Sequence, residues 1–302
     1  MGGLIGPAGV IRAITRQFED AKRRTKLSTQ MDSLIAKSKS DVISLTEEYD
    51  EDAKYDLVYI LKESDYNPDL VMSLRSVEKF CKYRNIWIIG YKPTWLTNVK
   101  HLPTKQTGNK WKNSELNWRT ACECPEISDN FILMNDDFIA IRPIHDWENE
   151  LNVCLGNVGD EADRWAKKQK PSRWQWGFIY AKDLLKVCHS RSDYNYESHL
   201  PIIINKQKYL KFLELKPIKE FIKSSKVLHK RSLYKNLYPS DKVSLPHKIK
   251  DVKIMLGYDL SDGYLKENWI SVFDDVIGNV IKFPKINKFL SEMFPDKSKF
   301  EL

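Results

Sequence analysis

The sequence predicts an α/β protein with a mixed sheet flanked by helices. Between residues 55 and 140, short apolar runs alternate with helix-like segments, which is typical of parallel strands joined by crossover helices. Hydrophobic residues make up 42% of the 302-residue chain, enough for a sizeable core. No run of about 18 apolar residues occurs, so no membrane span is expected.

The strands and helices of this sheet are expected in a regular order. Three apolar runs predict buried strands at residues 56–61, 85–90 and 131–134. Between them, a helix is predicted over residues 69–81, with Asp69 as its N-cap, and another over residues 113–122. Neither a GxGxxG nor a GxxxxGKS/T loop is present, which disfavours Rossmann dehydrogenases and P-loop enzymes.

Helical segments are expected before and after the strand region in the sequence. Apolar residues recur at three- and four-residue spacing over residues 11–49, which predicts one or two amphipathic helices. Residues 206–221 are predicted to be a helix interrupted by Pro217, and residues 268–302 to be helical segments broken at Pro284. The predicted parts are a helical N-terminal extension, a central domain and a helical C-terminal segment, at residues 1–52, 53–260 and 261–302.

The basic residues of the chain are concentrated in one stretch. The net charge is +8, and residues 206–253 hold 14 basic and 4 acidic side chains, which accounts for the whole excess. A basic surface favours polyanions, although lysines can also serve only to solvate helices. Trp165, Trp174 and Trp176 lie among further basic residues and are either core residues or a surface that stacks sugars or bases.

Five cysteines are sparsely placed, and only Cys122 and Cys124 are close to each other. One residue between them is not the spacing of a zinc hairpin or a redox pair, so reduced thiols are expected. The first ten residues lack the charged and apolar regions of a signal peptide, which predicts a cytoplasmic protein.

Asn135-Asp136-Asp137 is the most informative motif, because it directly follows the third predicted strand. Ligands of α/β sheets bind at the carboxyl ends of strands, and paired carboxylates there can hold Mg²⁺ or Mn²⁺ on a diphosphate. The alternative is an ordinary Asn-Asp turn that leaves a strand.

Several short blocks resemble the Stealth family of sugar-phosphate transferases and, more broadly, GT-A nucleotide-sugar glycosyltransferases of the small phage type. The similar blocks are Leu74-Arg-Ser-Val-Glu-Lys-Phe80, Asn85-Ile-Trp-Ile-Ile-Gly90, Pro93-Thr-Trp-Leu96, Asp129 to Phe138, Tyr196-Glu-Ser-His-Leu-Pro201 and His229-Lys-Arg-Ser-Leu-Tyr234. The resemblance implies a GT-A-like fold and transfer from a nucleotide-sugar, with a UDP-sugar first among donors. A phage-encoded chain would act in the host cytoplasm.

The resemblance also implies roles for individual residues. Asp136 would act in catalysis, and Asp137 would hold Mn²⁺ or Mg²⁺ together with His229. Glu197 or His199 would accept the proton of the acceptor hydroxyl. The expected donor-binding residues are Tyr59, Glu63, Arg75, Lys112, Asn113 and Arg231. Each has an ordinary alternative, such as an Arg75–Glu78 ion pair or an Asn113 N-cap.

The basic stretch and the tryptophans together suggest a DNA acceptor, with sugar added to a hydroxylated base flipped out of the stack. One alternative is a Stealth-like hexose-1-phosphate transferase or a glycosyltransferase acting on a surface polysaccharide. The other is a non-enzymatic nucleic-acid-binding protein that keeps the fold.

Overall fold

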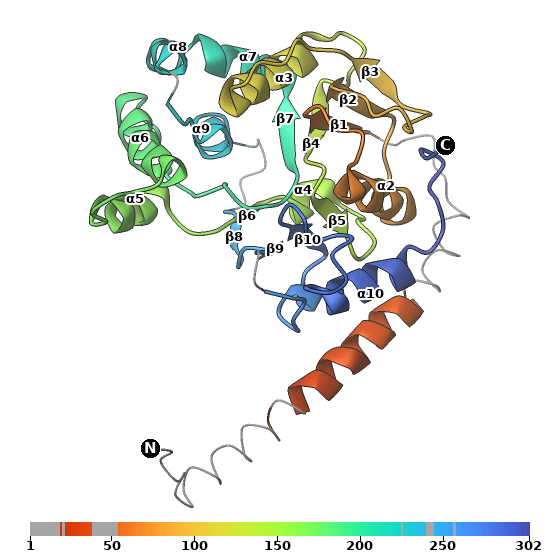
Figure 1. The fold of residues 1–302 in the computed structure, drawn as a ribbon. Helices are drawn as coiled ribbons and strands as arrows, with labels where there is room; N and C mark the ends of the chain where they lie inside the picture. The colour runs from red at the N-terminus through yellow and green to blue at the C-terminus, as the bar shows by residue number, and fades with distance from the viewer. Residues whose placement is uncertain (1–18, 20–21, 38–53, 225, 240–244, 256–257) are drawn as a thin grey trace, which may run out of the picture.

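The structure is a computed structural model that describes residues 19, 22–37, 54–224, 226–239, 245–255 and 258–302. Its centre is a five-stranded sheet in the order β3-β2-β1-β4-β7 (Figure 1). The strands are β1 (Asp56–Leu61), β2 (Ile86–Gly90), β3 (Lys100–Leu102), β4 (Asn130–Met134) and β7 (Ile202–Asn205). The first four run parallel, and β7 pairs antiparallel with β4, so the predicted mixed α/β sheet is confirmed.

Both faces of the sheet are buried, because successive side chains of a strand point to opposite faces. Along β1, Leu57, Tyr59 and Leu61 enter one hydrophobic core, and Val58 enters the other. The second core is covered by α3 (Lys110–Glu123), α6 (Arg173–Val187), α7 (Lys206–Glu214) and α9 (Lys230–Leu237). The first is covered by α2 (Pro68–Phe80) and α10 (Pro284–Met293).

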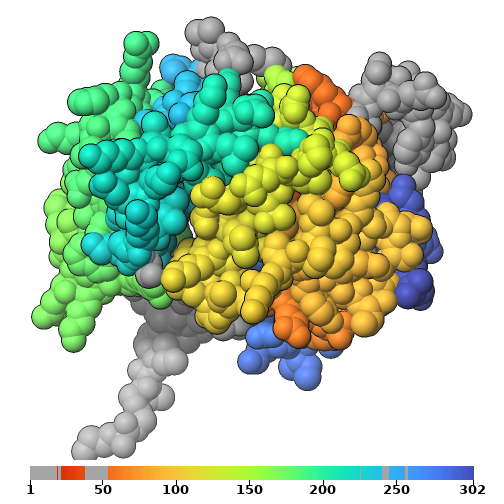
Figure 2. All heavy atoms as spheres, turned by 90° about the horizontal axis from the view of Figure 1, so that it is seen from above, coloured from red at the N-terminus to blue at the C-terminus, as the bar shows by residue number. Residues whose placement is uncertain are grey.

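The remaining elements lie around this sheet. Figure 1 shows α5 and α6 as a green lobe at one side of the molecule, with α8 above it. Figure 2 shows α3 in yellow beside the teal helices α7 and α8 on the face seen from above. The shorter elements are α4 (Trp147–Glu150), α5 (Val158–Ala166), α8 (Lys216–Lys223), η1 (Tyr264–Lys266), β6 (Val153–Cys154) and β8 (His247–Lys248).

The C-terminal part belongs to the same core, which corrects the predicted separate helical segment over residues 261–302. It contains β10 (Trp269–Val272), which pairs with β5 (Phe138–Ala140) and β9 (Lys253–Ile254). Pro284 does not break a helix but begins α10, where the missing N–H of proline costs no hydrogen bond.

The N-terminal extension is described only in part. Residues 22–37 are helical, and Leu27, Met31 and Ile35 join the first hydrophobic core. The Lys26 ammonium lies 3.8 Å from the Asp262 carboxylate. The rest of the helices predicted over residues 11–49 lies outside the described residues.

Both predicted helix starts move toward the N-terminus. Asn67, not Asp69, caps α2, and its side chain accepts the N–H of Leu70. Asn109, not Asn113, caps α3 and accepts the N–H groups of Trp111 and Lys112. Asparagine is as good an N-cap as aspartate, so local sequence did not distinguish these positions.

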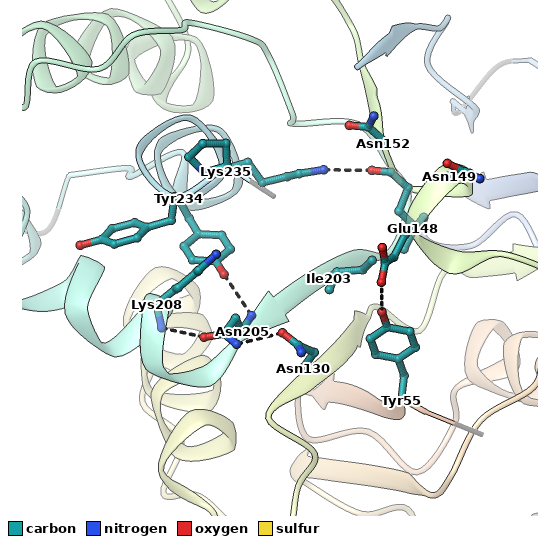
Figure 3. A pocket seen from close by; sticks show the side chains of 13 residues that line it. Tyr55, Asn130, Glu148, Asn149, Asn152, Ile203, Asn205, Lys208, Tyr234 and Lys235 are labelled. Atoms are coloured by element: carbon teal, nitrogen blue, oxygen red, sulfur yellow. Dashed lines mark hydrogen bonds between the residues drawn. The ribbon is translucent and has the colours of Figure 1, made fainter. Parts of the chain in front are cut away.

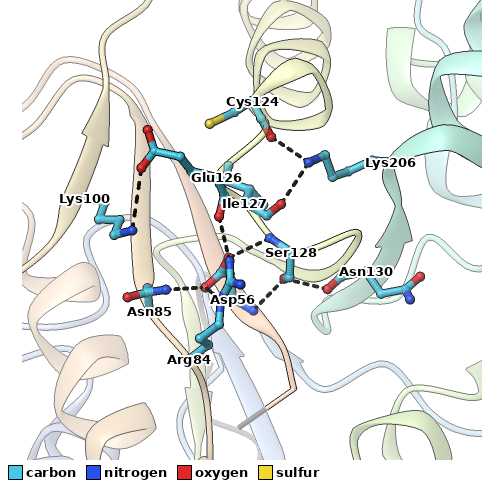
Figure 4. A network of polar contacts seen from close by, with 10 residues as sticks. All are labelled: Asp56, Arg84, Asn85, Lys100, Cys124, Glu126, Ile127, Ser128, Asn130 and Lys206. Carbon is cyan, nitrogen blue, oxygen red and sulfur yellow. Dashed lines mark hydrogen bonds and ion pairs between the residues drawn. The ribbon is translucent and has the colours of Figure 1, made fainter. Parts of the chain in front are cut away.

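A buried carboxylate fixes the amino edge of the sheet (Figure 4). Asp56 has no exposed side-chain surface and accepts hydrogen bonds from Arg84, Asn85 and the backbone N–H of Ser128. These bonds lower the pKa of Asp56 although burial opposes the shift. The network joins β1 to the segments before β2 and β4.

Candidate active site

The carboxyl ends of the parallel strands meet at one edge of the sheet, and the candidate residues gather there. β1 and β4 end at Leu61 and Met134, and Asn135-Asp136-Asp137 follows at once. Because β7 runs the other way, Ile202 at its start pairs with Leu133. The segment that carries His199 therefore reaches the same edge, as ligand-binding residues of α/β sheets do.

The two aspartates of the motif have different surroundings. Asp136 accepts a hydrogen bond from Nδ2 of Asn67 at 2.8 Å, and burial raises its pKa. Asp137 is 8% exposed, and its Oδ2 accepts hydrogen bonds from Lys253 at 3.1 Å and Ser271 at 2.7 Å. Asp137 therefore already has a cationic partner at hydrogen-bond distance, whereas the side-chain hydrogen bond of Asp136 comes from a neutral amide.

A third carboxylate, Asp69, joins this pair and was missed as a functional residue in the sequence. Its Oδ1 is buried without a hydrogen-bond partner among the described residues. Burial, together with the charges of Asp136 and Asp137, raises its pKa to about 8. The only signal in the sequence was a carboxylate in the first turn of a helix, which resembles ordinary capping.

These carboxylates fit a divalent cation that a ligand helps to hold. Within the described ranges, no group of three or more His, Cys, Asp or Glu side chains gathers closely enough to hold a metal alone. Mg²⁺ is usually bound by one or two carboxylates plus substrate phosphates, so Asp136 and Asp137 suffice in number. The orphaned oxygen of Asp69 is the observation that favours added positive charge at this place.

His199 is oriented by a carboxylate. Its Nδ1 lies 2.8 Å from Oδ2 of Asp251, and because a carboxylate only accepts, Nδ1 carries the proton. Neutral His199 then presents the lone pair of Nε2 for proton transfer. Asp251 is two residues before Lys253, which pairs with Asp137. One short segment therefore contacts both His199 and Asp137.

Glu197 and His229 have internal partners and lie 3.6 Å apart, between Oε2 and Nδ1, and their predicted roles in proton transfer and metal binding stay predictions. Oε1 of Glu197 accepts the N–H of Ser232 in the first turn of α9, so the carboxylate caps that helix. His229 is 2% exposed, and its Nε2 donates to the carbonyl of Trp174. Burial lowers the pKa of His229, whose ring contacts Gly177 and Phe178 rather than Asp137.

Two basic residues follow His229 on α9. Lys230 is 9% exposed, its ammonium donates to Oγ of Ser114 at 2.9 Å, and burial lowers its pKa to about 7. Arg231 donates from Nη2 to the carbonyls of Leu200 and Pro201, and its buried Nε has no partner among the described residues. Arg231 thus holds the segment next to His199, and its predicted contact with a donor stays a prediction.

Two predicted donor contacts are internal in this structure. The Tyr59 ring is fully buried, and its hydroxyl lies 2.9 Å from Oγ of Ser73. Arg75 pairs with Glu301 through two hydrogen bonds of 2.7 Å and donates a third to the carbonyl of Phe294. Within the described residues, the Tyr59 hydroxyl and the Arg75 guanidinium therefore both have internal partners, and their predicted contacts with a nucleotide-sugar stay predictions.

The other predicted donor residues lie at the carboxyl edge. Glu63 is exposed just after β1. Lys112 is exposed in the first turn of α3. Asn113 clamps the preceding loop, because it bonds both the N–H and the carbonyl of Thr107. These three residues remain candidates by position.

The tryptophans divide between surface and interior. Trp174 and Trp176 of α6 are 41% and 40% exposed, and Trp176 stacks on Tyr180. Trp165 is partly buried, and its ring lies under Arg164 and Lys168. Tyr180 also lies under the ammonium of Lys226, so aromatic and basic side chains alternate on this lobe.

A separate cavity of about 400 Å³ opens at the opposite, amino edge of the sheet (Figure 3). Tyr55 and Asn130, which line it, stand before β1 and at the start of β4. Its polar groups largely satisfy one another, for example Tyr55 with Glu148 and Lys235 with the carbonyl of Leu151. None of the predicted site residues lines it.

No family model matches the chain, and no curated protein matches it. Among solved structures, it is similar to apo xyloside xylosyltransferase 1 from mouse, at 9% identity and a TM-score of 0.35, over 67% of this chain and 88% of that one. It is also similar to the glycosyltransferase GlyE of Streptococcus pneumoniae TIGR4, at 12% identity and a TM-score of 0.32, over 65% of this chain and 45% of that one.

The class that the fold and site define is an α/β protein with carboxylates and a carboxylate-bound histidine at the ligand-binding edge of its sheet. No helix within the described residues is long and apolar enough to cross a bilayer.

Proposed function

We propose that this chain is a glycosyltransferase that moves a sugar from a nucleotide-sugar donor, with a UDP-sugar as the first candidate, to a hydroxyl group. The observation that carries this proposal is the placement of the Asp136–Asp137 carboxylates and the His199–Asp251 pair at one edge of the sheet. Carboxylates that anchor a diphosphate and an oriented base are the two parts that this reaction requires.

The carboxylates would form the donor end of the site. Asp136 and Asp137 would hold Mg²⁺ or Mn²⁺, with Asp69 beside them. Such an ion, when bound, neutralises charge on a departing diphosphate. Lys253, now 3.1 Å from Asp137, brings a second positive charge to the same place. Asn67 orients Asp136 through its 2.8 Å hydrogen bond.

His199 would form the acceptor end. Its Nε2 takes the proton from the acceptor hydroxyl while that oxygen forms its bond to the anomeric carbon of the sugar. The bond from this carbon to the diphosphate oxygen breaks, and the nucleoside diphosphate leaves with the electron pair. Asp251 keeps the proton on Nδ1 and stabilises the imidazolium that forms.

For the acceptor, we propose DNA bearing a hydroxylated base. The exposed faces of Trp174 and Trp176 can stack on bases, and the basic stretch 206–253 can contact phosphates. A surface polysaccharide as acceptor, hexose-1-phosphate transfer and nucleic-acid binding without catalysis are distinguishable outcomes of the same experiments.

The test is a screen of sugar nucleotides by thermal shift with and without Mn²⁺, followed by mass analysis of products from hydroxylated DNA and glycans. A donor that raises the melting temperature in wild type but not in Asp137→Ala supports the proposal. A hexose increment on the product distinguishes glycosyl transfer from hexose-1-phosphate transfer. Full activity of Asp137→Ala, or in excess EDTA, contradicts the metal-dependent reaction.

A further inference from the structure

A small hollow lies between the start of α3 and the segment that leads into α9, on the face shown in Figure 2. Its volume is about 50 Å³, which suits one small chemical group rather than a whole substrate. Lysines line it from three places in the chain, together with Asn109, Trp111 and Glu115. The lysines are Lys112, Lys226 and Lys230.

Lys230 is the central feature of the hollow, because it is the lysine that is nine-tenths buried. Its ammonium donates to Oγ of Ser114 at 2.9 Å and lies 4.5 Å from the Trp118 ring, and the charges of Glu115 and Glu197 act on it from further away. Among the described residues no carboxylate comes within ion-pair distance of it. A buried cation without a counter-ion is costly, and an anion in the hollow would remove most of that cost.

The start of α3 adds to this positive character. Its first turn has no acidic residue to offset the partial positive charge of the helix end, although Asn109 already accepts the N–H groups of Trp111 and Lys112. Lys112 and Lys226 are exposed at the mouth of the hollow. Glu115 also lines the hollow, but its carboxylate lies 3.2 Å from Nε of Arg119 and is paired there.

We propose that this hollow is a phosphate-binding subsite, with Lys230 as its buried anchor and Lys112 and Lys226 at its mouth. The proposal deepens the glycosyltransferase function and rests on it for the source of the phosphate. That source is either the donor diphosphate or a phosphodiester of the acceptor. Neither Asp136 nor Asp137 lines this hollow, whose lysines come from α3, from the segment before α9 and from α9 itself.

The experiment measures binding of inorganic phosphate, UDP and a short single-stranded oligonucleotide by calorimetry at low salt. The variants are Lys230→Met, which keeps the apolar stem, and Lys112→Met at the exposed mouth. Lys285→Met, an exposed lysine of α10 outside the basic stretch 206–253, is the matched control for loss of one charge. Thermal unfolding is measured for each protein.

We expect Lys230→Met to weaken phosphate binding at least tenfold, Lys112→Met to weaken it several-fold, and Lys285→Met to leave it unchanged. Loss of UDP affinity assigns the phosphate to the donor, and loss of oligonucleotide affinity assigns it to the acceptor. Equal phosphate affinity in wild type, Lys230→Met and Lys112→Met overturns the subsite. If the Lys230→Met protein does not fold, the phosphate affinity of Lys112→Met is the measurement that tests the subsite.

The two proposals fail in different ways. Sugar transfer by wild type with unchanged phosphate affinity in both variants removes the subsite and leaves the glycosyltransferase. Phosphate binding that depends on Lys230 in a wild-type protein that transfers no sugar removes the glycosyltransferase and leaves the subsite.

Discussion

Nδ1 of His199 lies 2.8 Å and 2.9 Å from the two carboxylate oxygens of Asp251, a residue 52 positions further along the chain. This contact also lowers the pKa of Asp251 against the effect of its burial. The pair fixes the histidine tautomer, so Asp251 is a positioning residue whose importance depends on the role of His199.

Asp251→Asn tests this relationship. We expect kcat to fall about 10²- to 10⁴-fold, the usual contribution of a general base, with little change in KM for the donor. The pH–rate profile should also move, because asparagine leaves the imidazole without its charged partner. His199→Ala should lower kcat by at least as much.

Glu220→Gln, which removes an exposed carboxylate of α8 that is not a candidate site residue, is the control for the pH–rate profile. An Asp251→Asn enzyme that keeps the wild-type profile and kcat contradicts the assignment of His199 as the base.

Asp69 should destabilise the protein when no divalent cation is present. Its folded-state pKa of about 8 is above the unfolded value near 4, so folding becomes less favourable as pH rises between these values. Asp69→Asn should therefore raise the free energy of unfolding at pH 8, by up to about 5 kcal/mol since each pKa unit corresponds to about 1.4 kcal/mol, and have little effect at pH 4. Urea denaturation at the two pH values measures the difference.

The same variant also tests the cation site. Mn²⁺ should stabilise wild type more than Asp69→Asn, since the added cation offsets a charge that the variant lacks. Equal urea midpoints for the two proteins at pH 8 in EDTA would show that burial and the neighbouring carboxylates do not make the Asp69 charge destabilising.

Arg75 and Glu301 tie α2 to the C-terminus, with side chains that are 16% and 9% exposed. Removing one partner leaves a poorly solvated charge, so Arg75→Met or Glu301→Gln should each cost about 2–4 kcal/mol of stability. The double variant should cost less than the sum of the two, as a double-mutant cycle by chemical denaturation would measure.

Because the Arg75 guanidinium is 16% exposed and already bonds Glu301 and the carbonyl of Phe294, the folded Arg75→Met enzyme should bind the nucleotide-sugar with the affinity of wild type. A large rise in KM for the donor with unchanged stability would instead restore Arg75 to the donor site.

Asp56 should contribute to acid sensitivity. Its pKa is lowered in the folded state by Arg84, Asn85 and the Ser128 N–H, so its stabilising effect is present above the unfolded pKa of about 4. The effect is lost as pH falls through the lowered folded value. Asp56→Asn should lower the unfolding midpoint at pH 7 and flatten its decline between pH 5 and pH 2, measured by thermal melts. A decline as steep as that of wild type would exclude Asp56 as a source of acid sensitivity.

The sequence by itself determined the strands around the site. Unbroken apolar runs such as 131–134 are suited to buried parallel strands, and the observed bounds of β1, β2 and β4 differ from the prediction by at most one residue. It also located Asp136 and Asp137, since a residue that follows a parallel strand must reach the carboxyl edge. Residues 268–272 were predicted to be helical and form β10, because pairing with β5 and β9 decides such a short apolar segment.

Only the tertiary structure decided the partners of each side chain. Arg75 and Tyr59 looked like donor contacts, yet one pairs with a residue 226 positions away and the other points into the core. Asp251 contacts His199, 52 positions away, and Lys230 donates to Ser114, 116 positions away; neither contact is visible in the sequence. Spacing along a chain fixes which face of a strand or helix a residue occupies, but packing of distant segments fixes which charges are buried together. That electrostatic environment distinguishes a site residue from a structural one.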